Sequence, residues 1–323
     1  MSRTIAVCDI GGTHARFALA GIAVGRVATL SEPVVLETAE FASFQSAWQE
    51  FGRRLGHRPP SELGMSFAGP VGSDVLKLTN NPWVIRPALM DERLGVTNFR
   101  IVNDFGAVGY AVAALDDDGF QHLCGPTRPL PRDGVTTIIG PGTGLGVAQL
   151  LRTPSGDHII ETEGGHVDFA PLDAIEDKIL DFLRQSHRRV SVERIVAGSG
   201  LANIYRALSA IEDRPVRHDD DVALWGAALE GSDPLAVVAL DRLFLSLGAV
   251  AGDLALAHGA KAVVIAGGLG HRLSDRFATS GFADRFIAKG RFERRMEAIP
   301  VKLITHPQPG LYGAAAAYAE DHP

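Results

Sequence analysis

The sequence predicts an α/β protein of two domains, each a mixed sheet flanked by helices. At 323 residues and 34.3 kDa, the chain is too long for one ordinary hydrophobic core. Apolar strand patterns alternate with helical patterns in both halves. The stretch VTTIIGPGTGLGVAQLL also repeats an arrangement found in IAVCDIGGTHARFALAGI, in which a glycine turn separates two apolar strands. Two related domains are therefore expected.

The first half begins as a βββα unit. Residues 5–10 and 16–22 are predicted strands around a Gly-Gly turn, and the end of VATLSEPVVLETA is a third. FASFQSAWQEFGRRL has a helical pattern. ELGMSFAG is the next predicted strand, and FRIVND is a strand that ends at Asp104 before the small-residue helix AVGYAVAAL.

The second half follows a turn-rich segment, DDDGFQHLCGPTRPLPRDG, which we expect to cross between domains. After the second strand–turn–strand unit come three predicted helices, in AIEDKILDFLRQSH, SGLANIYRALSAI and PLAVVALDRLFLSLGAVAGDLALAHG. A strand, AVVIAGG, and a terminal helix, GLYGAAAAYAE, complete the chain. The run DDD at 219–221 is expected to be a solvated loop.

Composition narrows the classes of partner. The net charge is −7, and no run of Lys and Arg forms a stripe along a helix, so nucleic-acid binding is not expected. Cys8 and Cys124 form no CxxC or metal-ligand pattern, which favours a reducing compartment. No apolar run approaches the length of a membrane span, and the N-terminus enters a strand rather than a signal peptide. These features predict a cytoplasmic protein with small-molecule partners and no membrane partner.

The two glycine turns are candidate phosphate sites. Gly11-Gly12-Thr13 is the first glycine turn and Gly142-Thr143-Gly144 is the second. Glycines let backbone N–H groups approach a phosphate, and the threonines add hydroxyl donors. Asp9 precedes the first turn, where a carboxylate can hold Mg²⁺ directly or through water. When Gly12-Thr13 is aligned with Gly142-Thr143, the position of Asp9 corresponds to Ile139, so the metal-side carboxylate belongs to the first half only.

The simpler interpretation of DIGGT is a hairpin, because Gly-Gly is a common hairpin turn. A third glycine segment favours the nucleotide interpretation. VVIAGGLG is a strand that ends in Gly267-Gly268 before a helix, and these glycines could pack against adenine and ribose. None of the three segments fits the Walker A or GxGxxG pattern.

Polar residues at strand ends suggest a sugar site. Asp104 stands between a strand and a helix, where open α/β sheets place their ligands, and is a candidate base for a hydroxyl nucleophile. Asn103-Asp104 could instead simply cap the helix. Glu163 precedes Gly164-Gly165 in a loop, and Glu193 could be an exposed charge at a helix start. His166 with Asp168 has no further ligand at suitable spacing, so a metal site is not expected there.

The order of the motifs carries a family resemblance. Strand–DIGGT–strand, GTG and AGG resemble the two phosphate motifs and the adenosine motif of the hexokinase, actin and Hsp70 superfamily. TNNPW, VNDFGAV, GPGTGLGVA, EGGHVDFAP, VSVERIVAGSGL and VIAGG together resemble bacterial glucokinases of the type found in enteric bacteria, over essentially the whole chain. The cysteine-rich motif of the related ROK sugar kinases is missing. The resemblance implies the two-domain actin-like ATPase fold, which is ribonuclease-H-like.

The resemblance also implies roles for individual residues. Asp104 would be the catalytic base, and Asp9 would be the metal-side residue. The implied sugar contacts are Asn80, Asn103, Asp104, Glu163, His166 and Glu193. The implied nucleotide contacts are Cys8, Asp9, Ile10, Gly11, Gly12, Thr13, Gly142, Thr143, Gly144, Gly267 and Gly268. Asn81 is an alternative to Asn80 in TNNPW. The chain departs from the family at His14, where Asn is usual.

The implied reaction is transfer of the γ-phosphoryl group of ATP to the 6-hydroxyl of glucose, with Mg²⁺ on the phosphates. The implied division is a small domain of residues 1–110 plus 301–323 and a large domain of 111–300, with the active site in the cleft between them. The implied assembly is a homodimer. A kinase for another hexose, an inactive sugar sensor and a filament protein are the alternatives, and polyphosphate or ADP could replace ATP as the donor.

Overall fold

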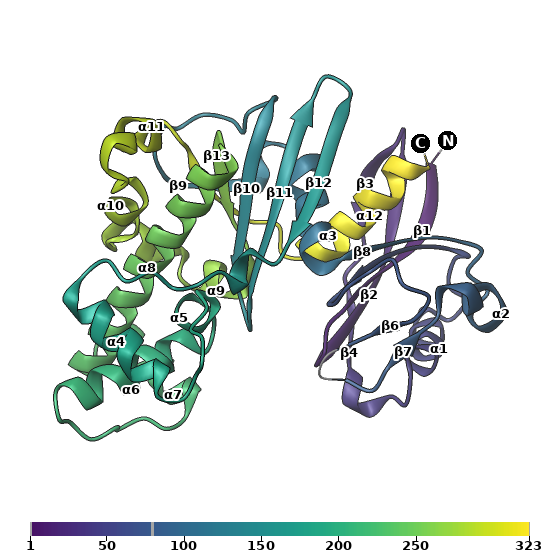
Figure 1. The fold of residues 1–323 in the computed structure, drawn as a ribbon. Coiled ribbons are helices and arrows are strands. Elements are labelled where there is room, and N and C mark those ends of the chain that lie inside the picture. Colours follow the sequence, from purple (N-terminus) through teal and green to yellow (C-terminus); the bar gives the residue numbers. More distant parts are fainter. Residues whose placement is uncertain (1, 79–80, 323) are drawn as a thin grey trace. The chain divides into compact units, whose positions relative to one another are not determined.

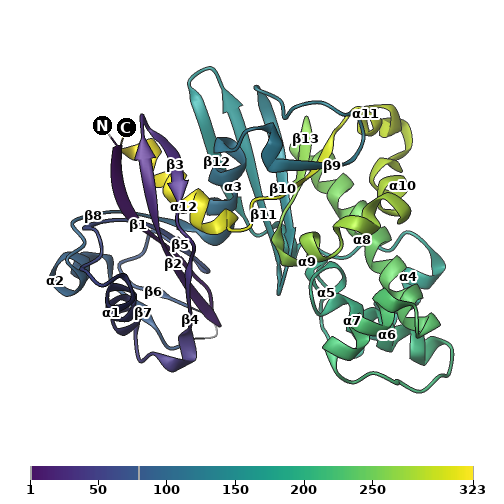
Figure 2. The same cartoon turned by 180° about the vertical axis from the view of Figure 1, so that it is seen from behind.

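A computed structural model describes residues 2–78 and 81–322 (Figures 1 and 2). The chain divides into two compact units. Unit 1 comprises Met1–Asp116, Ile159–Glu161 and His306–Pro323, and unit 2 comprises Asp117–His158 and Thr162–Thr305. The chain therefore passes between the units after residue 116, on both sides of residues 159–161, and after residue 305. Each unit has a mixed sheet with helices, which confirms the predicted fold class.

Unit 1 is built on a sheet with the strand order β3-β2-β1-β5-β8, and β4 pairs with β2. The first hairpin is antiparallel, whereas β5 pairs parallel to β1 and β8 parallel to β5. The strands are β1 Ser2–Ile10, β2 His14–Ala23, β3 Arg26–Leu30, β4 Val34–Glu37, β5 Glu62–Phe67 and β8 Asn98–Asn103, with a small pair β6 Leu76–Lys77 and β7 Val84–Ile85. The helices are α1 Phe44–Leu55, α2 Met90–Leu94, α3 Asp104–Ala114 and α12 Pro309–Asp321.

Alternation along β1 separates the two cores of unit 1. Ala6, Cys8 and Ile10 share a core with the aromatic residues of α1. Ile5 and Val7 share the other core with one face of α12. Asp9, two residues after Val7, therefore lies on the α12 side of the sheet. Because β1 is covered on both faces, its end holds Asp9 and the first glycine turn on a rigid support.

Unit 2 has a sheet with the strand order β12-β11-β10-β13-β14-β9. Its strands are β9 Phe120–Cys124, β10 Gly134–Pro141, β11 Leu145–Thr153, β12 Gly156–Thr162, β13 Ala262–Ile265 and β14 Val301–Ile304. Residues 159–161 of β12 belong to unit 1. Its helices are α4 Ala174–Arg184, α5 Glu193–Val196, α6 Gly200–Ile211, α7 Asp221–Glu230, α8 Pro234–His258, α9 Gly267–Arg272, α10 Phe282–Ile287 and α11 Glu293–Glu297. Figure 1 shows α8 running among α4, α6, α7 and α10.

Helix α8 is the longest helix of the described chain and is the centre of the unit 2 core. Its buried residues include Leu243, Phe244, Leu247 and Ala251, which share one core with α4 to α7 and α10. Of the described helices, α8 alone is long and apolar enough to cross a membrane by length and composition, with a mean hydropathy of 1.8. This differs from the expectation that no apolar run approaches the length of a membrane span. Because 72% of that window is buried inside the structure, this one helix is weak evidence for a span.

The two sheets repeat one topology. In each, a glycine turn joins an antiparallel hairpin, β1–β2 or β10–β11, and the first strand of the hairpin pairs parallel to a later strand, β5 or β13. The pattern of buried positions after the turn is the same from Ala15 to Ala20 as from Leu145 to Leu150. The internal repeat inferred from the two glycine turns is thus present in the fold.

Three details differ from expectation. The turn-rich segment contains β9, which pairs with β14. Since β14 belongs to the sheet of unit 2, residues 301–305 lie in unit 2 and not with the C-terminal helix, and the division after the first half falls at 116 instead of 110. Within the run at 219–221, Asp220 is the N-cap of α7 and accepts a hydrogen bond from Ala223 N at 2.8 Å, so it is more than a solvated loop.

Candidate active site

The first glycine turn is fixed through its carbonyl groups. Gly11 N donates to His14 O at 3.0 Å and closes the turn. Gly12 O accepts hydrogen bonds from Thr38 Oγ1 at 2.6 Å and Asn81 Nδ2 at 3.3 Å, and Thr38 N donates to Thr13 O at 2.9 Å. Sequence reasoning missed Thr38, because this contact joins segments far apart in the chain.

The N–H groups of the first turn remain available. Within the described residues, no group accepts a hydrogen bond from the N–H of Gly12 or Thr13. The Thr13 side chain is exposed. Successive unpaired backbone N–H groups form an anion-binding concavity. The turn therefore has the donors that a phosphate group needs.

The Asp9 carboxylate is held at the end of β1. Ser66 Oγ donates to Asp9 Oδ1 at 2.6 Å, and Arg16 Nη1 lies 3.8 Å from Oδ2. Burial raises the pKa of Asp9, although the Ser66 hydrogen bond and the charge of Arg16 act in the opposite direction. A Cβ on Gly310 would lie 2.9 to 3.1 Å from the carboxyl atoms, so the glycine leaves space for them.

Two predicted nucleotide contacts in β1, Cys8 and Ile10, have fully buried side chains. Both belong to the core that α1 covers. Burial raises the pKa of the Cys8 thiol well above its ordinary value, so this side chain is a small apolar group. Any part that these two residues take in nucleotide binding must come from their backbone.

Asn103 and Asp104 have different local tasks. Asn103 is the N-cap of α3, with Oδ1 accepting from Phe105 N at 2.9 Å and Gly106 N at 3.3 Å, while Nδ2 donates to Gly69 O at 3.2 Å. Asp104 is the first residue of the helix, and its Oδ1 accepts from Phe105 N at 2.9 Å. The cap is therefore Asn103, and capping alone does not explain an acid at 104.

The second glycine turn is closed by residues of the α5 segment. Gly142 N donates to Gly144 O at 2.8 Å, and Gly142 O accepts from Gly198 N at 2.7 Å. Glu193, the first residue of α5, accepts a hydrogen bond from Leu145 N at 2.9 Å. A Cβ on Gly144 would lie 2.6 Å from Glu193 Oε2, so the carboxylate is packed against the turn. Glu193 is thus not a plain exposed charge at a helix start.

The EGGH segment, Glu163 to His166, lies against β11, the strand that follows the second glycine turn. A Cβ on Gly165 would lie 2.0 Å from Leu145 O, and one on Gly164 would lie 3.0 Å from Val147. The carboxylate of Glu163 and the imidazole of His166 are exposed and lie 3.9 Å apart. Val192 N donates to Val167 O at 2.9 Å, which joins this segment to the residues just before Glu193.

The third glycine segment follows β13 and packs against the end of β10, the strand that leads into the second turn. Gly267 has φ of +79°, which favours glycine, and a Cβ there would lie 2.5 Å from Pro141 O. Gly268 has open space around its Cα, with nothing within 4 Å of a Cβ built there. The second turn, the EGGH segment, Glu193 and Gly267 therefore all contact the backbone between residues 140 and 147.

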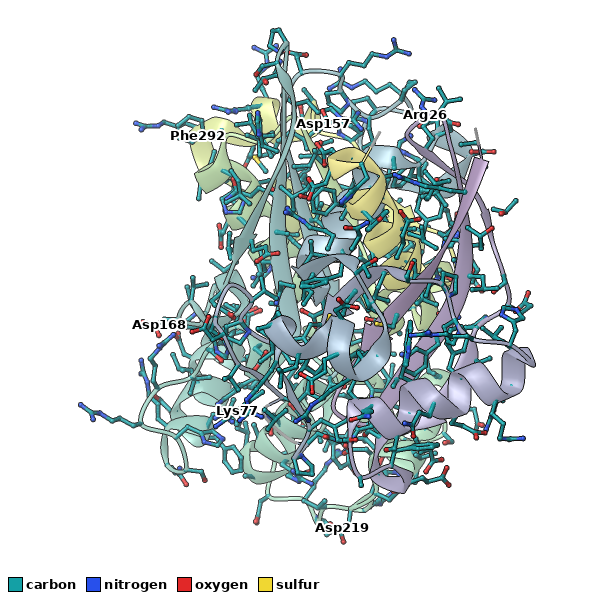
Figure 3. All side chains as sticks on the ribbon, turned by 90° about the vertical axis from the view of Figure 1, so that its right-hand side faces the viewer. Arg26, Lys77, Asp157, Asp168, Asp219 and Phe292 are labelled. Carbon is teal, nitrogen blue, oxygen red and sulfur yellow. The ribbon has the colours of Figure 1, made fainter. Side chains whose placement is uncertain are left out.

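Some predicted residues are not brought into these groups. Asn80 lies outside the described residues. Asp168 is exposed and ion-paired with Arg189 (Figure 3). Ser66 and Gly310, which surround Asp9, were not predicted. The signals for them were a lone serine in the apolar strand ELGMSF and the glycine at the start of the last helix.

Asp9 fits a magnesium ion that is held mainly by phosphates. The described residues contain no group of three or more His, Cys, Asp or Glu side chains that could hold a metal. Mg²⁺ at phosphate sites keeps waters and uses one or two carboxylates together with the substrate oxygens. The single carboxylate beside the first glycine turn, with the space left by Gly310, agrees with that pattern.

The fold and these turns define a sugar kinase of the actin-like fold. A glucokinase from an Antarctic psychrotroph has a TM-score of 0.85 and 31% identity, covering 97% of this chain and 98% of that chain. Glucokinase from Balamuthia mandrillaris, solved in complex with glucose, has a TM-score of 0.79 at 22% identity, with 98% and 93% coverage, and supports the fold alone.

Sequence comparison identifies the family. The glucokinase family model matches residues 6–321. Glucokinase of Zymomonas mobilis is 59% identical over 318 residues, covering 98% of both chains. Glucokinase of Paramagnetospirillum magneticum is 38% identical over 319 residues, covering 98% of this chain and 97% of that protein. The chain belongs to the glucokinase family and is an ATP-dependent hexose kinase.

Proposed function

We propose that this kinase transfers the γ-phosphoryl group of ATP to the 6-hydroxyl of D-glucose. The products are glucose 6-phosphate and ADP, as in the first step of glucose use in glycolysis. One observation carries the residue assignment: Asn103 caps α3, so the acid that follows it at 104 is not required as the cap. An aspartate that directly follows a strand and begins a helix is placed for a ligand in open α/β sheets.

In the proposed reaction, the Asp104 carboxylate accepts the proton of the 6-hydroxyl. The hydroxyl oxygen forms a bond to the γ-phosphorus, and the bond from the γ-phosphorus to the bridging oxygen breaks, so that ADP leaves with the electron pair. Phosphoryl transfer needs little covalent help from a protein, and positioning and charge stabilisation dominate. Asp104 therefore acts on the proton and on the orientation of the hydroxyl.

The other hydroxyls of glucose would bind to Asn103, Glu163, His166 and Glu193, with Asn80 as a further proposed contact. Support comes from unit 2, where the EGGH segment and Glu193 both contact Leu145. Glu163 and His166 expose their polar atoms to solvent, so both are available to a ligand. Polar groups paired with specific hydroxyls discriminate strongly, because a wrong epimer leaves one of them unpaired.

ATP would bind between the glycine turns. The N–H groups and hydroxyls of the first and second turns would hold the phosphates, and Gly267-Gly268 would lie against the adenosine. Asp9 would hold Mg²⁺ directly or through water, and Mg²⁺ would neutralise the charge of the phosphate oxygens. The unpaired N–H groups of Gly12 and Thr13 support this role for the first turn.

This arrangement requires that the two units close around the substrates and exclude water, which would otherwise accept the phosphoryl group. The active site would then lie in a cleft between a small N-terminal domain, completed by the C-terminal helix, and a large domain. Solution scattering with glucose and a nonhydrolysable ATP analogue tests this requirement. We expect a smaller radius of gyration, and an unchanged radius would contradict closure.

A matrix of donors and sugars tests the proposed reaction. Purified protein is assayed with ATP, ADP and polyphosphate against glucose, mannose, fructose and N-acetylhexosamines, with the nucleotide product or sugar phosphate measured directly. The highest kcat/KM is expected for ATP with glucose. A higher value for another sugar or donor would replace that substrate in the proposal, and binding of glucose without any turnover would indicate a sensor.

We further propose a cytoplasmic homodimer. The homodimer rests on the family resemblance, and the cytoplasmic location rests on the pattern of cysteines. Light scattering after size-exclusion chromatography measures the assembly. A mass of about one chain across the working concentration range would exclude the dimer.

A further inference from the structure

A carboxylate from a distant strand contacts the start of α3. Glu161 lies on the strand β12, and its Oε1 accepts a hydrogen bond from Asn103 N at 3.0 Å. Asn103 is the last residue of β8, which is an edge strand of its sheet. The outer edge of β8 therefore has no neighbouring strand in that sheet. Glu161 as a whole residue is exposed to solvent. The hydrogen bond therefore gives an acceptor to the residue that immediately precedes Asp104.

Two glycines of α3 make room for this strand. A Cβ on Gly106 would lie 2.2 Å from Glu161 Oε1, and its three nearest atoms all belong to Glu161. A Cβ on Gly109 would lie 2.7 Å from Ile159 Cγ2. Gly106 and Gly109 are one helical turn apart, and Ile159 and Glu161 share one face of their strand. Side chains of the strand thus take the space that side chains of the helix would occupy.

The geometry reproduces a capping box with its acid supplied from outside the helix. In a capping box, a Glu or Gln at the third helical position accepts a hydrogen bond from the N-cap N–H. In α3 the N-cap is Asn103 and the third position is Gly106, which has no side chain. Glu161 accepts the N-cap N–H in its place. A negative charge at this end of a helix is also favourable to the helix dipole.

We propose that Glu161 is a positioning residue for Asp104 and Asn103, acting through the N-terminus of α3. It fixes the backbone of Asn103, and so the direction in which the next residue presents its carboxylate. Glu161 is also only two residues before Glu163. The end of β12 and the residue after it therefore provide both Glu161, which positions the proposed base, and Glu163, a proposed sugar contact. This inference rests on the proposed function, because it assigns Glu161 to the same reaction.

The first test compares Glu161→Ala with Glu161→Gln. Alanine removes the acceptor, so we expect kcat for glucose to fall roughly ten- to hundred-fold, since small misplacements of catalytic groups have effects of that order. The KM for ATP should change by less than about twofold, because the effect is on the positioning of the base. Glutamine keeps an acceptor oxygen and should restore kcat to within about threefold of wild type.

A second comparison uses Gly106. Gly106→Ala alone should displace the Glu161 carboxylate and lower kcat by a similar factor. In the Glu161→Ala background the nearest atoms to the new methyl group are gone, so adding Gly106→Ala should lower kcat no further. Asp157→Ala is the matched control, because it removes another acid from the same strand. The ion pair of Asp157 is with Arg152, at 3.4 Å. The control should leave kcat unchanged; Asp157 is labelled in Figure 3.

Hydrogen exchange of the peptide that contains residues 98–112 separates this inference from the proposed function. Faster exchange at the start of α3 in Glu161→Ala than in Glu161→Gln supports the contact even if glucose is not the substrate. Full kcat in Glu161→Ala, or equal losses in the alanine and glutamine variants, would overturn the inference. Additive losses for Glu161→Ala and Gly106→Ala would do the same. Wild-type protein that is inactive on glucose would refute the proposed function only.

Discussion

At the scale of single residues, Asp9 and Asp104 differ in the groups around their carboxylates. Asp9 is packed between Ser66, Arg16 and Gly310 at the end of β1, beside a turn with free N–H groups. Asp104 starts a helix whose capping is done by its neighbour. We propose different roles for them, with Asp9 near the phosphates and Asp104 at the proton of the hydroxyl nucleophile.

The first prediction concerns the charge of Asp9. In Asp9→Asn the amide oxygen can still accept the Ser66 hydrogen bond, so the fold should hold. The apparent Mg²⁺ affinity and kcat should fall, while glucose binding without nucleotide should stay close to wild type. Enzyme assays across a Mg²⁺ titration and calorimetry measure these quantities. Asp91→Asn, at an exposed position on α2, is the control. Equal loss of glucose binding would show that Asp9 is structural.

The second prediction concerns sugar choice. Glu163→Gln keeps the shape of the side chain but replaces a pure acceptor with a mixed donor and acceptor. The KM for glucose should rise, and the preference for glucose over its epimers should fall. Competition assays with glucose and mannose measure the ratio of kcat/KM. Wild-type selectivity in this variant would remove the EGGH segment from the sugar site.

At the scale of elements, many strands and helices were predicted from apolar runs that meet glycines or caps, but α7 was missed although Asp220 caps it. The hairpins around both glycine turns and the strand before Asp104 follow from such local patterns. Strand β14 was missed because it has four residues and includes Lys302, whose buried side chain is ion-paired with Asp117. The contact of Glu193 with the second turn joins residues 48 positions apart, and no local pattern encodes it.

The third prediction concerns the packing of the EGGH segment. Gly165→Ala places a methyl group against Leu145 O and should destabilise the protein by roughly 1–3 kcal/mol, as overpacking does. For a unit of this size, each kcal/mol lowers Tm by about 2–4 °C. The KM for glucose should rise as well. Gly268→Ala, at a position with open space, is the control for Tm. An unchanged Tm and KM in Gly165→Ala would contradict the packing described here.

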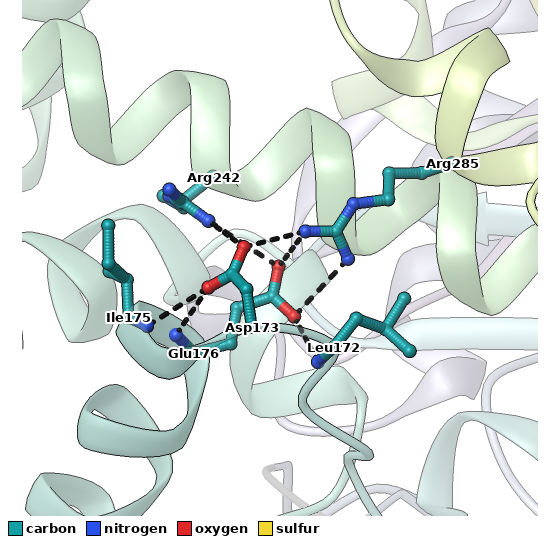
Figure 4. A network of polar contacts seen from close by, with 6 residues as sticks. All are labelled: Leu172, Asp173, Ile175, Glu176, Arg242 and Arg285. Carbon is teal, nitrogen blue, oxygen red and sulfur yellow. Dashed lines mark hydrogen bonds and ion pairs between the residues drawn. The ribbon is translucent and has the colours of Figure 1, made fainter.

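The fourth prediction concerns the acid network at the start of α4 (Figure 4). Asp173 caps the helix and contacts Arg242 and Arg285, and Glu176 also lies against Arg285, with 3.2 Å between Oε1 and Nη2. Burial alone would raise the pKa of Asp173, but the Glu176 N–H and Arg242 outweigh it, so the pKa is lowered. The carboxylate thus ties α4 to α8 and α10.

A carboxyl whose pKa is lower in the folded protein than in the unfolded chain stabilises the fold at any pH above its unfolded pKa. That stabilisation is lost as the pH falls through the folded-state pKa. Asp173→Asn keeps the cap but removes the charge, and should lower the free energy of unfolding at pH 7 by roughly 1 kcal/mol, allowing for partial exposure. The difference from wild type should shrink below a pH of about 3.9. Urea unfolding across pH measures it, with Asp181→Asn as the exposed control. A difference that is constant with pH would contradict this role.

At the scale of the whole molecule, one topology occurs twice but only one copy has a carboxylate before its glycine turn. The structural counterpart of Asp9 in unit 2 is Ile139 or Gly140, depending on whether the turns or the hairpin ends are aligned. The proposed base is also in unit 1, whereas the EGGH segment and Glu193 are in unit 2. In the proposed reaction, unit 1 therefore supplies the proton and metal chemistry, and unit 2 supplies most of the sugar recognition.

The most direct test of this account is Asp104→Asn, with kcat and glucose affinity measured on the same preparation. The amide has nearly the same shape and can still hydrogen-bond the 6-hydroxyl, and Asn103 continues to cap α3. Glucose should bind within several-fold of wild type by calorimetry, because the contacts proposed in unit 2 are unchanged. The amide cannot accept the proton, so kcat should fall about 10²- to 10⁴-fold with little change in KM. Turnover above roughly a tenth of the wild-type rate would contradict a base at Asp104.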